Sequence, residues 1–177
     1  TPDAPWTARL ASLSGTLAGR ALTGRGEISH RAGTYDLRGV RIANGPSHVD
    51  IDGRWGDTVN LRWSADVRSL ALLHPDLAGE LVSTGRVNGR AARPQVEGEL
   101  RARRVGFAGA TIESLDVDAD VDGTDQRESR LDARAAEIDL GAVVLESARL
   151  DAHGRMSEHA VALEYASQGD QERRVPG

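Results

Sequence analysis

The sequence predicts an all-β fold built as an elongated antiparallel sheet with one apolar face. Three observations predict it: apolar and polar residues alternate, turn-forming residues recur at short intervals, and no long helical period is present. The clearest run is Leu-Asp-Val-Asp-Ala-Asp-Val-Asp at residues 115–122. Side chains alternate across a strand, so Leu115, Val117 and Val121 face one way while the aspartates face the other.

Composition narrows the class of protein further. A chain of 177 residues fits one domain, and its 39% hydrophobic residues are mostly Ala, Val and Leu, with only 3% aromatic residues. The net charge is -5, and all 22 basic residues are arginine, which argues against a nucleic-acid partner because a nucleic-acid backbone requires a basic surface. Cysteine is absent, and no apolar run approaches the roughly 20 residues of a membrane span. The chain starts without Met, in the middle of a pattern, and we expect it to be a segment of a longer protein.

The same alternation predicts further strands on both sides of this run. Near the start, Leu13 and Leu17 share a face, and we expect Leu22 and Ile28 to lie on adjoining strands. Later alternating segments cover residues 48–52, 59–68, 96–103, 131–135, 148–153 and 161–165.

Turn signals separate these strands. The candidates are Asn44-Gly45-Pro46, Gly56-Asp57, Asn88-Gly89, Asp122-Gly123 and His153-Gly154. Such short connections favour antiparallel neighbours, and the spacing predicts a meander of about ten to fourteen strands. Residues 69–79 are the exception, where we expect a single helical turn with Pro75 at its first position and Gly79 as its cap.

A weak internal repeat supports a stacked arrangement. Residues 100–123 align with residues 131–154, at an offset typical of repeat arrays. Units of this size usually stack because one alone cannot bury its apolar face.

The motifs for chemistry are weak. Asp118-x-Asp120-x-Asp122-Gly123 opens like an EF-hand loop, but Ser129 occupies the twelfth position, where that loop needs a bidentate Glu. His153 and His159 lack the spacing of a zinc site on a helix. We therefore expect no catalytic residue, no metal site, no cofactor and no enzymatic activity.

The apolar face itself is the candidate site. A sheet with one apolar face needs a helix layer, a second sheet, closure into a barrel, or a ligand to cover it. A closed β-sandwich is one solution, and a sheet curled into an open U-shaped groove is the other. The small lining residues and the scarcity of aromatics favour the groove. The predicted lining residues are Val49, Ile51, Leu61, Trp63, Leu100, Leu115, Val117, Val121, Leu131, Leu150, Val161 and Leu163.

Two segments resemble the β-repeat region of the TamB family. The first runs from "ADVRSLALLHPDLAGELVSTGRVNG" to "LDVDADVDG", with a Leu-rich turn containing Pro-Asp-Leu, and the second is "LDAHGRMSEHAVALEYA". The resemblance covers residues 10–167 and implies an elongated groove, called a β-taco. It also implies a periplasmic segment of a protein anchored in the inner membrane of a Gram-negative bacterium. The implied function is transport of phospholipid, by its acyl chains, toward the outer membrane, with an Omp85-class partner similar to TamA.

Two other functions stay open. Exposed strand edges can pair with unfolded β-barrel segments, which predicts a chaperone-like role in the insertion of outer-membrane proteins and autotransporters. A filled β-sandwich predicts a plain adhesive or surface module. In every case we expect residues 1–9 to be a lead-in, residues 10–167 to form the sheet domain, and residues 168–177 to be a flexible polar tail.

Overall fold

The protein forms one sheet of twelve strands, as seen in a computed structural model that describes residues 4–17, 19–155, 157–167 and 173–176. The strands are β1 (Trp6–Leu17), β2 (Arg20–Arg31), β3 (Thr34–Asn44), β4 (Ser47–Trp55), β5 (Thr58–Val67), β6 (Ala78–Arg90), β7 (Arg93–Phe107), β8 (Ala110–Asp122), β9 (Ser129–Asp139), β10 (Val144–Arg155), β11 (Glu158–Ser167) and β12 (Arg173–Pro176). A short 3-10 helix, η1 (Leu70–Leu72), lies between β5 and β6.

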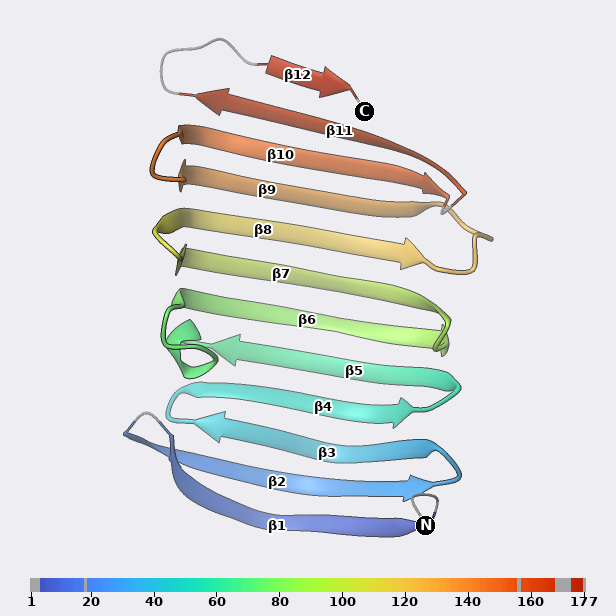
Figure 1. The fold of residues 1–177 in the computed structure, drawn as a ribbon. Coiled ribbons are helices and arrows are strands. Elements are labelled where there is room, and N and C mark those ends of the chain that lie inside the picture. Colours follow the sequence, from blue (N-terminus) through green and yellow to red (C-terminus); the bar gives the residue numbers. More distant parts are fainter. Residues whose placement is uncertain (1–3, 18, 156, 168–172, 177) are drawn as a thin grey trace.

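The strand order in the sheet is the order in the sequence, and every neighbouring pair is antiparallel (Figure 1). β1 and β12 lie at opposite ends, so the sheet does not close into a barrel. Packing within the described residues runs between neighbouring strands and between η1 and β6, and no second layer covers either face. The predicted all-β groove class is confirmed, and the closed β-sandwich is wrong because twelve strands share a single layer.

The meander gives the sheet two rims where strands turn. The right rim in Figure 1 holds the β2–β3, β4–β5, β6–β7, β8–β9 and β10–β11 connections. The left rim holds the β1–β2, β3–β4, β5–β6, β7–β8 and β9–β10 connections, including η1. The internal repeat corresponds to the β7–β8 and β9–β10 hairpins, which span the sheet between these rims.

Three of the five predicted turns are confirmed, at Asn44-Gly45-Pro46, Gly56-Asp57 and Asp122-Gly123. The other two are wrong, because Asn88-Gly89 lies inside β6 and His153-Gly154 lies inside β10. Gly89 and Gly154 have φ values of 100° and 128°, a conformation that L side chains rarely adopt. Glycine fits these two positions because the strand backbone there has a positive φ. The sequence alone does not distinguish this use of glycine from its use in a turn.

Two smaller expectations about local structure are also wrong. The helical turn exists, but it ends at Leu72, before Pro75, and Gly79 belongs to β6. Leu22 and Ile28 lie on the same strand, β2, whose register shifts between Arg25 and Glu27. A bulge of this kind lets two apolar segments with broken alternation continue along one strand.

The fold has little closed core. Among the described residues six hydrophobic side chains are buried, namely Val40, Val59, Val67, Leu70, Ala102 and Ile138. The accessible surface is 11785 Å², whereas a compact protein of 18.9 kDa exposes about 8,300 Å². The chain therefore exposes more surface than a compact protein of its mass, as expected of a single-layer sheet.

The predicted domain boundaries stay a prediction. β1 begins within the expected lead-in, and β12 pairs with β11 within the expected tail. Residues 168–172 and 177 of that tail lie outside the described residues.

Candidate functional site

The cross-strand register assembles the apolar face from every strand between β3 and β11. Residues directly opposite each other in an antiparallel pair point to the same side of the sheet. One continuous row across the sheet is Ile42, Val49, Ala65, Ser83, Leu100, Val117, Ala133, Leu150 and Leu163. Ser83 is its only polar member. The apolar side of each strand therefore continues into the apolar side of the next strand, and together they form one surface.

Three parallel rows complete the face. The next row carries Ile51, Trp63, Leu131 and Val161, and another carries Leu61, Val87, Val96 and Val121. Leu115 lies in a row with Val67, Leu81 and Ala102. All twelve predicted lining residues therefore lie on one face, while their contact with a lipid stays a prediction.

Side chains of this face remain open to solvent. Most of the twelve are half-buried by their neighbours in the sheet. Toward the C-terminal end Val161 and Leu163 are 37% and 42% exposed, and toward the N-terminal end Ile42 is 47% exposed. Such a contiguous exposed apolar surface is typical of a binding site.

The middle of the face is flat because of an indole ring and two glycines. A Cβ built on Gly85 would collide with the Trp63 ring, and a Cβ on Gly98 would lie 3.1 Å from it. The ring of Trp63 therefore extends from β5 over β6 and β7. Its Nε1–H donates to Ser83 Oγ at 3.1 Å, so the one polar atom of the indole is satisfied within the sheet.

A hollow opens on this face close to the right rim. Its volume is about 290 Å³, and Val121, Leu131 and Ala152 form its apolar walls. Arg155 and His159 border it where β10 turns into β11. The hollow thus combines an apolar floor with cationic or polar groups at its outer edge.

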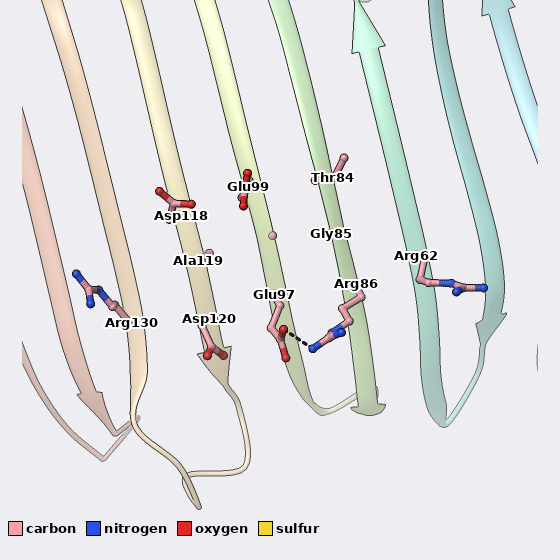
Figure 2. A pocket seen from close by; sticks show the side chains of 11 residues that line it. Arg62, Thr84, Gly85, Arg86, Glu97, Glu99, Asp118, Ala119, Asp120 and Arg130 are labelled. Carbon is pink, nitrogen blue, oxygen red and sulfur yellow. Dashed lines mark hydrogen bonds and ion pairs between the residues drawn. The ribbon is translucent and has the colours of Figure 1, made fainter.

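The opposite face is charged and largely paired with itself. Figure 2 shows a hollow of about 470 Å³ on this face, with the side chains of Arg62, Arg86, Glu97, Asp118 and Arg130 around it. Arg86 and Glu97 form an ion pair across β6 and β7. Three arginines and four carboxylates line this hollow, so the two signs of charge are nearly balanced around it.

A buried carboxylate organises the β9 and β10 part of the polar face. Asp132 is 5% exposed. It accepts a hydrogen bond from Arg149 at 2.9 Å and forms an ion pair with Arg134 at 3.0 Å. Burial raises its pKa, but the Arg149 hydrogen bond and the charges of Arg134, Arg149 and Arg130 outweigh burial and lower it. This network joins β9 to β10 through side chains on the polar face.

The aspartate run that resembles a calcium loop serves the β8–β9 turn. Thr124 donates its hydroxyl to Asp122 at 2.6 Å and its backbone N–H at 2.9 Å, and the backbone N–H of Arg127 donates at 2.8 Å. With Gln95, these bonds outweigh burial and lower the pKa of Asp122 to about 2. Asp120 pairs with the Arg127 guanidinium at 2.7 Å. In the described part of the chain, no group of His, Asp and Glu is arranged to hold a metal ion.

Sequence reasoning missed part of the apolar face on β6. Leu81, Ser83, Gly85 and Val87 alternate correctly, but Ser and Gly interrupt the hydrophobic signal. Their identity is explained only by Trp63, which lies over them from the neighbouring strand. No signal within β6 itself could have revealed this contact.

A single-layer sheet with one uncovered apolar face defines a class of protein that presents an extended hydrophobic surface. The chain belongs to the family described as "TamB, N-terminal domain", whose model matches residues 4–171. No solved structure matches the chain. Family membership gives it a TamB-related role in the bacterial envelope, within an assembly and transport module. No helix of the described residues is long and apolar enough to cross a membrane.

Proposed function

We propose that this chain shields the acyl chains of phospholipids on its apolar face, as one segment of a conduit between the inner and outer membranes. The observation that carries the proposal is the continuous apolar face from β3 to β11, which no other part of the described structure covers. Burying acyl chains there stabilises the complex by about 0.8 kcal/mol per methylene. Charged headgroups remain in water at a rim.

The geometry of the sheet supports a conduit in preference to a closed pocket. Twelve strands about 4.8 Å apart make a surface of about 50 Å in length. The lining is non-directional, so acyl chains can move from row to row without breaking hydrogen bonds. The periplasmic location, the inner-membrane anchor and a TamA-like Omp85 partner are parts of this proposal and belong to the full-length protein.

Trp63 offers a direct test of the proposed contact. In the W6F/W55F variant Trp63 is the one remaining tryptophan of the chain. Phospholipids brominated along the acyl chain should quench the fluorescence of Trp63, whereas the same phospholipids without bromine should not. Native mass spectrometry of the unmodified chain should show discrete phospholipid adducts. A lipid-free mass together with unquenched Trp63 would contradict the proposal.

A second candidate function rests on the edge strand β1. Its outer edge pairs with no strand among the described residues, so its backbone groups can add a strand of an unfolded outer-membrane protein. Such pairing uses backbone atoms and does not require the apolar face. Binding of an unfolded β-barrel segment that survives Val117→Asp would favour this role over lipid shielding.

A further inference from the structure

Two consecutive turns of the left rim carry large apolar side chains at their tips. At the β7–β8 turn Phe107 is 54% exposed, and at the β9–β10 turn Leu140, Val143 and Val144 are 54%, 49% and 46% exposed. Right-rim turns from β6 to β11 have only small or polar residues at their described positions. Turns favour glycine and polar residues, and exposed apolar groups that lie together indicate an interaction site. We call these four side chains the left-rim patch.

The backbone beneath this patch is already paired. The Leu140 N–H donates to the Val143 carbonyl at 2.9 Å, and strands β7 to β10 lie in the interior of the sheet, with a neighbour on each side. The patch therefore presents side chains and no free strand edge. Behind the tips one register row is apolar on all four strands, with the residues Val105, Ile112, Ile138 and Leu145.

A row of carboxylates lies beside the left-rim patch. Glu113, Glu137 and Glu146 are exposed, and none of them forms an ion pair with a described residue. The pairs on either side of these positions keep one register from β8 to β10, so Glu113 falls opposite Glu137, and Glu137 falls opposite Glu146. Like charges directly opposite each other destabilise a sheet. A bound cation would remove that repulsion.

Negative charge is in excess at this end of the four strands. Residues 103–114 and 135–147 contain two arginines, Arg103 and Arg104, and four acids, Glu113, Glu137, Asp139 and Glu146. Arg104 pairs with Glu80 at 3.1 Å, and Asp139 accepts the backbone N–H of Gly141 at 2.7 Å. Arg103 alone cannot balance three glutamates. The surface therefore combines exposed hydrocarbon with unbalanced negative charge.

We propose that the left-rim patch and the row of three glutamates bind a basic amphipathic helix of another protein. The apolar side of the helix covers the patch, and its lysine or arginine side chains reach the glutamates. A helix pairs its own backbone groups, so it suits a rim that offers no strand edge. Three strand spacings from β7 to β10 give about 15 Å, the length of about ten helical residues.

A phospholipid surface has the wrong charge for this rim, because its phosphates would lie against the glutamates. The proposal goes beyond lipid shielding and does not depend on it. None of the twelve predicted lining residues belongs to the left-rim patch or to the row of glutamates. Loss of helix binding and loss of lipid capture can therefore be measured separately.

The first test uses a fluorescent helical peptide of about 14 residues, with leucine on one side and lysine on the other. The same peptide with glutamate in place of lysine is the control. Fluorescence anisotropy measures the binding of each peptide to the full chain. The lysine peptide should bind at least tenfold more tightly than the glutamate peptide. Equal affinity for the two peptides, or no binding of the lysine peptide, would overturn the proposal.

The second test compares two triple variants with the same change of charge. E113Q/E137Q/E146Q neutralises the row beside the patch. D57N/E128Q/E158Q neutralises three exposed acids of the right rim, which also form no ion pair with a described residue. The first variant should bind the lysine peptide about tenfold more weakly, because three charge pairs are lost together. The control should change less than twofold, and equal losses would overturn the proposal.

The third test removes the hydrocarbon of the patch. F107S/L140S/V143S should bind the lysine peptide at least tenfold more weakly, with unchanged circular dichroism because these side chains are exposed. Unchanged affinity in the folded variant would overturn the proposal. If the variant does not fold, the glutamine variant decides alone. Flotation with phosphatidylglycerol vesicles tests the other occupant. Vesicle binding that this variant loses and E113Q/E137Q/E146Q strengthens would overturn the proposal in favour of a membrane contact.

Discussion

The two faces of this sheet are built from the same strands, but one face is charged and the other is apolar. On the polar face charged groups find partners within the sheet, as Asp132 does with Arg149 and Arg134. On the other face the rows through Val117 and Leu131 meet no further layer of protein. A face whose groups satisfy one another needs no partner, whereas an uncovered apolar face gains free energy from any hydrocarbon that covers it. The comparison is the basis on which we propose binding for the apolar face and a stabilising role for the polar face.

The largest expected effect comes from adding a charge to the apolar face. Val117→Asp should reduce phospholipid capture at least tenfold, because acyl chains cannot cover a carboxylate without removing its water. Circular dichroism should change little, since in an open sheet the carboxylate still reaches solvent. Asn60→Asp is the matched control, because it adds the same charge on the polar face opposite Arg54. Unfolding of Val117→Asp, or equal lipid capture by both variants, would contradict the assignment.

The next effect concerns the flat centre of the apolar face. Gly85→Ala should lower the free energy of unfolding by about 1–3 kcal/mol, because its Cβ meets the Trp63 ring and the Glu97 carbonyl oxygen. Gly15→Ala is a suitable control, since a Cβ on Gly15 meets no atom within 4 Å. Urea unfolding followed by circular dichroism measures both variants. If the two alanines cost the same, Trp63 does not lie against β6 in solution.

A third prediction concerns pH and the turn that follows β8. Asp122 has a pKa lowered to about 2 because the Thr124 hydroxyl and the Thr124 and Arg127 backbone N–H groups bind its charged form. Its stabilising effect is therefore complete above the ordinary pKa of about 4 and is lost as pH falls toward about 2.

Asp122→Ala tests this pH dependence. It should lower the unfolding midpoint at pH 7, and the difference from the unmodified chain should shrink between about pH 4 and pH 2. Thermal unfolding at a series of pH values measures the difference. A difference that stays constant down to pH 2 would show that the carboxylate charge has no role.

The smallest expected effect is the loss of a single exposed ion pair. Arg86→Gln breaks the pair with Glu97 on the polar face, and it should cost less than about 1 kcal/mol because solvent screens exposed pairs. Lipid capture should not change. A loss of lipid capture as large as that of Val117→Asp would remove the division of roles between the two faces.

Much of the fold follows from local patterns that one strand contains on its own. The alternation at 115–122 predicts β8 and its two faces, and the same pattern places all twelve predicted lining residues on one side of the sheet. Glycine was less informative. Gly45 and Gly123 follow strands as predicted, while Gly89 and Gly154 lie within strands, because both situations call for a residue without a side chain.

The sequence by itself determined the all-β class, the antiparallel order, the two faces of the strands that alternate clearly, such as β8, and the TamB resemblance, since each depends on neighbours two to a few residues apart. Only the tertiary structure decided that the sheet stays a single open layer, because alternation is the same in a sandwich and in a groove. It also decided which residues without local signal matter, such as Gly85 beneath Trp63. Those relations join residues on different strands, and register, which is a property of the assembled sheet, brings them together.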